Sequence, residues 1–166
     1  MTKNYRHQLW TTPNLPVTLQ DRIDCPVSDP NFVAISDTCY FVEKTPMTYD
    51  DAQLNCQNKL GTSWILFEPR DFNTNKLVFA AAGNLVLNQA WWLGMNDRAN
   101  EGQYVYASDK QDVVNGLWRP GEPNLHNERC VLGYYKLDES DISGEWLDYP
   151  CDRIVRSICQ EQKTGM

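Results

Sequence analysis

Residues 144–151 read GEWLDYPC, a short strand-like run that ends in a cysteine. From Trp91 onward the chain holds five such runs, rich in the aromatic and β-branched residues that strands favour. They are AWWLGM (90–95), GQYVYAS (102–108), CVLGYYKL (130–137), GEWLD (144–148) and RIVRSICQ (153–160). Polar stretches rich in Gly, Pro, Asn and Asp separate them. The stretch from Asn96 to Arg129 is the longest and least periodic, and such a loop in a compact domain is usually either functional or wrongly assigned.

The first third of the chain predicts one strand followed by two helices. CYFVEK, residues 39–44, has the composition of a strand. A helix is expected next, with Thr48 as its N-cap and Gly61 as its stop. Ala52 and Cys56 lie four residues apart and so share one face of this helix, which places Cys56 against the core.

A second helix is expected from near Asp71 to Gly83. Two early helices followed by several antiparallel strands predict the α+β class. The chain has 166 residues, enough for one ordinary domain. We expect that domain at residues 25–160, after an N-terminal extension at residues 1–24 and before a short C-terminal tail at residues 161–166.

The charge balance excludes one class of partner. Fifteen Lys and Arg against 22 Asp and Glu give a net charge of -7. This argues against nucleic acid, because binding to a phosphate backbone depends on clustered basic residues. No run approaches the roughly 18–20 apolar residues that span a bilayer, so membrane insertion is not expected.

The cysteines indicate the compartment. There are six, an even number, with no Cys-x-x-Cys pair and only two histidines, which fits disulfides better than a zinc site. Disulfides favour a secreted, extracellular protein. The polar N-terminus does not read as a signal peptide, so we expect that the leader is absent from this chain. No Ser–His–Asp or Cys–His arrangement is available, since the cysteines are paired and His7 lies in the extension, so no enzyme activity is expected.

Three motifs and the order of the cysteines give a resemblance to a known family. WWLG (91–94), WRPGEPN (118–124) and GEWLDYPC (144–151) resemble the C-type lectin-like domain family, in its long form with an EPN-type carbohydrate-recognition site. The resemblance covers Cys25 to Gln160. It implies an α+β fold of two helices and antiparallel sheets, three disulfides, and a long loop that binds calcium and sugar.

The resemblance also implies one pairing of the cysteines among the fifteen that are possible. The implied disulfides are Cys25–Cys39, Cys56–Cys159 and Cys130–Cys151.

A set of oxygen-bearing side chains points to a divalent ion. Glu122, Asn124, Glu128 and Asp148 offer three carboxylates and an amide oxygen, a hard-oxygen set that suits Ca²⁺ rather than zinc. Pro123 can supply a cis peptide between the first two. The plain alternative is a solvated acidic turn. The resemblance implies that these four residues hold one Ca²⁺ and bind carbohydrate, with mannose, N-acetylglucosamine, glucose or fucose types preferred over galactose.

Two departures from the family pattern bear on the metal. Leu147 stands where calcium-dependent members carry Asn, which removes one metal ligand. A second, auxiliary calcium site retains Asp97 and Glu101 but has Leu125 and Arg129 at its other two positions. We hypothesise that the Arg129 guanidinium occupies the vacant cation position and pairs with Asp97 or Glu101.

Three functions are therefore considered. The first is a calcium-dependent lectin for glycans on cell or microbial surfaces. The second is a protein-interaction module on the same fold, with an empty EPN loop. The third is calcium-independent sugar binding in which Leu147 offers an apolar contact. His126 is a candidate sugar contact, and residues 1–24 are a candidate for assembly into a homo-oligomer.

Overall fold

The computed structural model describes residues 25–86, 89–135 and 144–163. The expected N-terminal extension and the last three residues of the expected tail lie outside these ranges. Within them, no helix is long and apolar enough to cross a membrane.

The described residues form two helices and eight strands. In chain order they are β1 (Phe32–Ile35), β2 (Thr38–Met47), α1 (Tyr49–Leu60), β3 (Trp64–Leu66), α2 (Phe72–Leu85), β4 (Ala90–Asn96), β5 (Val105–Tyr106), β6 (Cys130–Tyr134), β7 (Glu145–Tyr149) and β8 (Val155–Glu161). The predicted α+β class is confirmed. The short strands β1 and β3 were not predicted, since strands of three or four residues are too short to carry a readable period.

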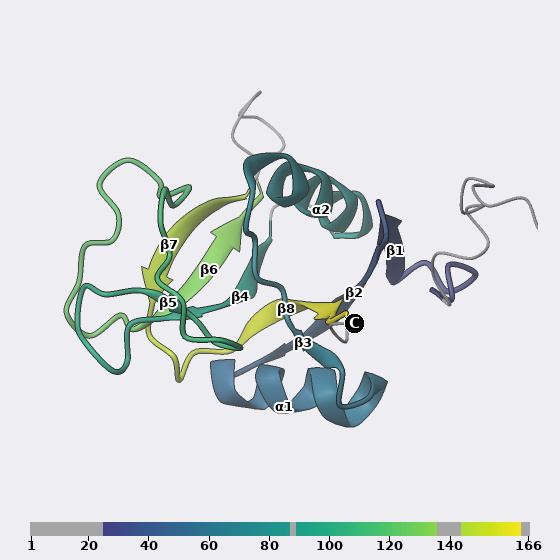
Figure 1. Cartoon of the computed structure of the whole chain (residues 1–166), viewed down its shortest axis with the longest axis horizontal. Helices are drawn as coiled ribbons and strands as arrows, with labels where there is room; N and C mark the ends of the chain where they lie inside the picture. Colours follow the sequence, from purple (N-terminus) through teal and green to yellow (C-terminus); the bar gives the residue numbers. More distant parts are fainter. Residues whose placement is uncertain (1–24, 87–88, 136–143, 164–166) are drawn as a thin grey trace, which may run out of the picture.

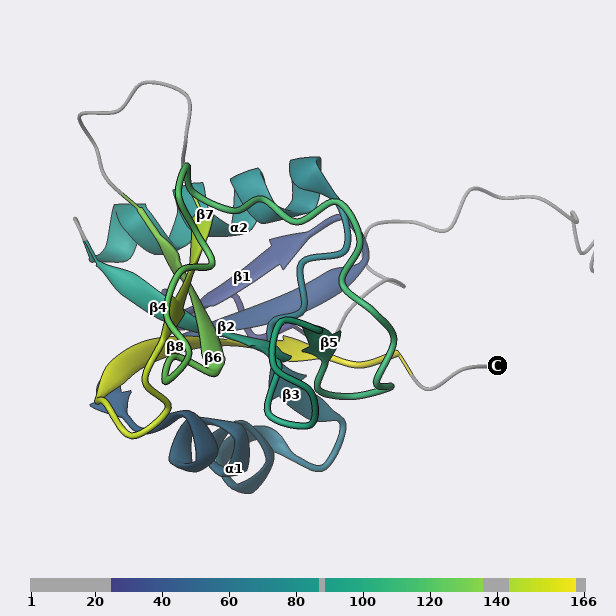
Figure 2. The same cartoon turned by 90° about the vertical axis from the view of Figure 1, so that its left-hand side faces the viewer.

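The strands form one sheet in the order β1-β2-β8-β4-β6-β7, with β3 paired to β8 and β5 paired to β4. Every pairing is antiparallel except that of β4 with β8, where Trp91 lies opposite Arg156. The helices lie on opposite sides of this sheet, α2 above it and α1 below it in both views (Figures 1 and 2).

Each helix covers its own half of the core. Val78, Phe79 and Ala82 of α2 pack in one cluster of buried residues, and Ala52 and Cys56 of α1 pack in a second. Strand β4 serves both, because successive side chains of a strand point to opposite faces. Its residues Trp91 and Trp92 are both fully buried, one in each cluster.

The helix boundaries test the predicted caps. The Thr48 hydroxyl accepts a hydrogen bond from the Asp51 amide at 3.2 Å, and Gly61 ends α1 at a φ of 119°. The Asp71 carboxylate caps α2 by accepting from the Thr74 amide at 2.8 Å. The predicted caps of α1 and the predicted start of α2 near Asp71 are confirmed, and the structure adds that Asp71 is itself the N-cap.

The predicted end of α2 at Gly83 is wrong. The helix continues to Leu85, and Gly83 is buried within it. A Cβ at this position would lie 2.3 Å from Cε1 of Tyr135. Gly83 is therefore a packing glycine that lets the helix approach the Tyr135 ring, and it does not terminate the helix.

The six cysteines pair as the resemblance implies. The disulfides are Cys25–Cys39, Cys56–Cys159 and Cys130–Cys151. The second joins α1 to β8 across 103 residues, a closure that the chain-entropy model values at about 4–5 kcal/mol. The third joins the start of β6 to the segment after β7.

The long segment between β4 and β6 contains only the two-residue strand β5 and occupies the left of Figure 1. It is not loosely attached. The Trp118 ring lies 4.7 Å from that of Tyr104 and 5.8 Å from that of Trp146, so three aromatic rings fix the segment to β7. Trp118 is therefore a packing residue.

We predict that Gly83→Ala lowers the free energy of unfolding by about 1–3 kcal/mol, the cost of overpacking a core, although alanine is the better helix former. Urea unfolding measures the change. Asn84→Ala, at the next and exposed position of α2, is the matched control and should shift stability by less than about 0.5 kcal/mol. Equal effects of the two substitutions would contradict the packing role.

Candidate functional site

The candidate site is built around the Asp148 carboxylate at the end of β7. Trp146 and Asp148 point to the same face of this strand and are 2% and 3% exposed. The Asp148 carboxylate accepts hydrogen bonds from the Asn124 amide at 3.1 Å and from the Leu125 amide at 3.2 Å. The Tyr104 hydroxyl lies 3.5 Å from the same group. Asp148 thus attaches the loop after Glu122 to the sheet.

Glu122 and Asn124 lie directly beside this carboxylate. The Glu122–Pro123 peptide bond is cis, as the sequence predicted. The Asn124 Nδ2 donates to Glu122 Oε1 at 2.8 Å. The second oxygen, Glu122 Oε2, is buried and accepts no hydrogen bond from the described part of the chain.

The carboxylates of Glu122, Glu128 and Asp148 lie close enough together for their negative charges to interact. Burial and the neighbouring Asp148 and Glu128 carboxylates raise the pKa of Glu122 to about 7, and the positive charge of Arg119 opposes the rise only in part. Burial and Asp148 also raise the pKa of Glu128. Carboxylates that share a site without a cation disfavour each other's charged form. The structure therefore brings three of the predicted residues into direct contact, and Glu128 close enough for its charge to act on Glu122.

The donor set fits Ca²⁺ in chemical kind, since it is all oxygen and has a buried oxygen without a partner. The side chains do not converge, however. Among the described residues, no group of three or more Asp, Glu, His or Cys side chains is arranged to hold a metal ion. One oxygen of Glu122 already accepts a hydrogen bond from the Asn124 side-chain amide, and the Asp148 carboxylate accepts hydrogen bonds from the backbone amides of the loop.

Leu147 points away from this cluster. It lies opposite Leu132 in the β6–β7 ladder and packs in the buried cluster that also contains Cys130 and Cys151. Its side chain is on the other face of β7 from Asp148, as the alternation of a strand requires. Leu147 is therefore a packing residue here.

The Arg129 hypothesis is confirmed in its contacts. Arg129 Nε donates to Asp97 Oδ1 at 2.8 Å, and Arg129 Nη2 donates to the Asp97 carbonyl at 2.7 Å. Arg129 Nη1 also lies 3.7 Å from Glu101 Oε2. The second oxygen of Asp97 accepts from the Gly102 amide at 2.7 Å. A guanidinium from within the chain thus forms ion pairs with both acidic groups.

Two further residues complete the surroundings. His126 contacts Glu101 through Nδ1, and its side chain is 94% exposed, so it stands at the surface of the loop. Tyr104 was not predicted to be part of the site. It reaches Asp148 across 44 residues of sequence, and no local pattern signals such a contact.

The sequence pattern described as the Lectin C-type domain matches residues 45–161. Collectin-11 of Bos taurus is 34% identical over 126 residues, which are 75% of this chain and 43% of that protein. A lectin of Patiria pectinifera named as α-N-acetylgalactosamine-specific is 27% identical over 84% of this chain and 83% of its own length. The chain spans less than half the length of several curated relatives that it matches, collectin-11 among them.

Solved structures agree on the fold. The crystal structure of human lithostathine superposes with a TM-score of 0.71 at 25% identity, covering 94% of this chain and all of that one. The relatives are lectins and carbohydrate-recognition domains rather than enzymes, in agreement with the expectation from sequence.

We predict that Arg129→Met lowers the free energy of unfolding by about 3 kcal/mol, because it leaves the buried Asp97 carboxylate without its cation. Arg98→Met is the control. It breaks the exposed pair with Asp50, worth less than about 1 kcal/mol. Both are measured by urea unfolding in EDTA.

The double variant Asp97→Asn/Arg129→Met should recover part of the loss, since no charge is then buried alone. If Arg129→Met and Arg98→Met cost the same, Arg129 is not the internal cation of this loop.

Proposed function

The chain belongs to the family of lectin C-type domains, and from this premise we propose that it binds glycans through one Ca²⁺ held by Glu122, Asn124, Glu128 and Asp148. When bound, the ion would ligate vicinal sugar hydroxyls. The protein's own part is to orient the sugar, since a hydroxyl can donate to the Glu122 carboxylate and accept from the Asn124 amide.

One observation carries the proposal: the Glu122 and Glu128 carboxylates lie close enough to Asp148 for their charges to interact, and the positive charge of Arg119 offsets this only in part. The buried Glu122 Oε2 has no partner in the described ranges, and the pKa of Glu122 is raised to about 7. The neighbouring acidic pair, Asp97 and Glu101, has Arg129. An added divalent cation would relieve the first cluster as the guanidinium relieves the second.

Binding requires side chains to turn. Glu122 and Asn124 are hydrogen-bonded to each other, so a cation would have to replace that bond with its own contacts. Leu147 contributes no oxygen. We expect water to fill its place, since Ca²⁺ accepts six to eight oxygens. The loss of one ligand should weaken binding, so we expect a Kd for Ca²⁺ at or above the 10⁻⁴–10⁻³ M typical of extracellular calcium modules.

The proposed sugars are of mannose, N-acetylglucosamine or fucose type, on cell or microbial surfaces. A relative is named for N-acetylgalactosamine, so galactose-type sugars belong in the test.

We also propose that the protein is extracellular, because three disulfides persist in oxidising compartments. Assembly into a homo-oligomer would raise the avidity of weak single sites.

The packing of Leu147 weakens the calcium-independent alternative, in which this side chain touches the sugar. Leu147 is half-buried against the cluster that contains Cys130 and Cys151, on the far side of β7 from Asp148. The protein-interaction module remains the alternative outcome of the test below.

We predict that titration calorimetry detects Ca²⁺ uptake, and that mannose then binds in its presence but not in EDTA. Glu122→Gln should weaken both by at least tenfold, about 1.4 kcal/mol. Glu161→Gln, which removes the same charge at the end of β8, should change neither.

Each other result has a clear meaning. Sugar binding that survives EDTA would overturn the role of the metal, and silence in both titrations would leave the protein-interaction module. Galactose binding in place of mannose would refute the proposed preference while retaining the site.

A second prediction concerns pH. Glu122 has a raised pKa in the folded protein, about 7 against an ordinary 4.5, so the folded state binds more protons in this window. Its stabilising effect is complete below about pH 4.5 and is lost as the pH rises through about 7. The metal-free protein should therefore melt at a lower temperature at about pH 8 than at about pH 5.

Glu122→Gln should flatten this part of the melting profile, whereas Glu161→Gln should not. Added Ca²⁺ should raise the melting temperature more at about pH 8 than at about pH 5, because protons compete for the same oxygens. A profile that rises between these pH values in the metal-free protein would contradict the crowding of carboxylates.

A further inference from the structure

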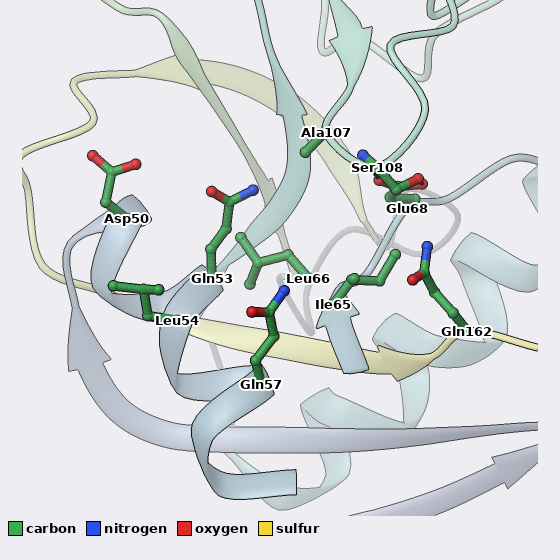
Figure 3. Close-up of a pocket in the computed structure, with 10 residues that line it drawn as sticks. All are labelled: Asp50, Gln53, Leu54, Gln57, Ile65, Leu66, Glu68, Ala107, Ser108 and Gln162. Carbon is green, nitrogen blue, oxygen red and sulfur yellow. Dashed lines mark hydrogen bonds between the residues drawn. The ribbon is translucent and has the colours of Figure 1, made fainter. Parts of the chain in front are cut away.

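A second concave surface lies between α1 and strand β3, and Ala107 and Ser108 of the long loop form part of its wall. This groove has a volume of about 540 Å³, within the range of small-molecule sites. Figure 3 shows side chains from three parts of the chain directed toward it: Gln53 and Gln57 from α1, Ile65 from β3, and Gln162 from the segment after β8. None of Glu122, Asn124, Glu128 and Asp148 lines it.

Three side-chain amides in this groove are uncommitted. Gln53 and Gln57 lie one turn apart on the same face of α1, and Gln162 faces them across the groove (Figure 3). In the part of the chain that the structure describes, none of the three side chains makes a hydrogen bond. Each primary amide offers one acceptor and two donors to a ligand.

The acidic groups at the groove are already neutralised. Asp50 forms a two-bond pair with Arg98, at 2.7 and 3.1 Å. Glu68 is 4% exposed and accepts from Arg70 at 2.7 Å and from the Ser108 amide and hydroxyl, both at 2.8 Å. The groove therefore offers no free charge to a cation, a phosphate or a charged peptide, and it fits an uncharged ligand.

Aliphatic side chains lie between the α1 glutamines and Gln162: Leu66 forms the buried floor and Ile65 is half-buried. Leu54 is 56% exposed on α1 and lines the edge of the groove, on the other side of the two glutamines from Ile65 (Figure 3). A leucine this exposed beside a groove provides apolar surface that a ligand can cover. Such a surface is complementary to an acetamido group. The amide of that group can hydrogen-bond to the glutamines, and its methyl can pack on the aliphatic side chains.

We propose that this groove is a second carbohydrate site, independent of metal, which recognises the acetamido group of an N-acetylated amino sugar. The acetamide pairs with the amides of Gln53 and Gln57, and its methyl covers Ile65 above the Leu66 floor. The ring hydroxyls face Gln162. With few contacts and no aromatic platform, a single sugar binds with a Kd on the order of 1–10 mM.

The test follows side-chain amide and methyl NMR signals of the full chain in EDTA as N-acetylglucosamine or its β1,4-linked disaccharide is added. The signals of Gln53, Gln57 and Ile65 should shift, whereas glucose, which lacks the acetamide, should leave them unmoved. Gln53→Ala/Gln57→Ala should weaken binding at least fivefold. Asn58→Ala, an exposed amide of α1 outside the groove, is the control.

The substitution Glu122→Gln distinguishes this groove from the proposed calcium site. It should leave the shifts that persist in EDTA unchanged. Shifts that vanish in EDTA or in Glu122→Gln would assign the binding to the calcium loop and overturn the proposal. Equal shifts with glucose, or none with either N-acetylated sugar, would also overturn it. Failure here leaves the calcium-dependent mannose titration unaffected, so the two proposals fail separately.

Discussion

The Asp148 carboxylate is the group on which the arrangement of the long loop depends. It is buried at the end of β7, yet its hydrogen-bond donors come from the loop, through the backbone amides of Asn124 and Leu125. A buried carboxylate needs such donors, because an unpaired charge away from water is very costly. The strand therefore holds the loop in place, and the Cys130–Cys151 disulfide and the ring of Trp118 support the same attachment.

The long loop handles its negative charge in two ways. Around Asp97 and Glu101 the chain supplies its own cation, Arg129, which forms an ion pair with each of the two carboxylates. Around Glu122 and Asp148 the nearest compensation is Arg119, and it does not prevent the pKa of Glu122 from rising to about 7. The contrast between these halves gives the calcium proposal its physical basis. The carboxylates of one half form ion pairs with Arg129, whereas those of the other half still raise the pKa of Glu122.

Much of the fold could be predicted because its signals are local. Thr48, Gly61 and Asp71 act on the backbone within four residues, so their roles as caps follow from chain order. The prediction for Gly83 was wrong for the same reason. A glycine near the end of a helical pattern predicts a helix stop, and the ring of Tyr135, which explains this glycine, lies 52 positions away in the sequence. The pairing of Arg129 with Asp97 was also predicted, but only by comparison with the family pattern, and no spacing rule joins residues 32 apart.

By itself, the sequence determined the fold class, both caps of α1, the start of α2, the oxygen-rich character of the candidate site and, through family resemblance, the three disulfides. Only the tertiary structure decided that Leu147 packs inward, that Tyr104 reaches Asp148, and that three glutamines from α1 and the C-terminal segment share a groove. The reason is physical. Caps and periods depend on neighbours along the chain, whereas the direction of a strand side chain and the partners across a sheet depend on register, which long-range packing sets.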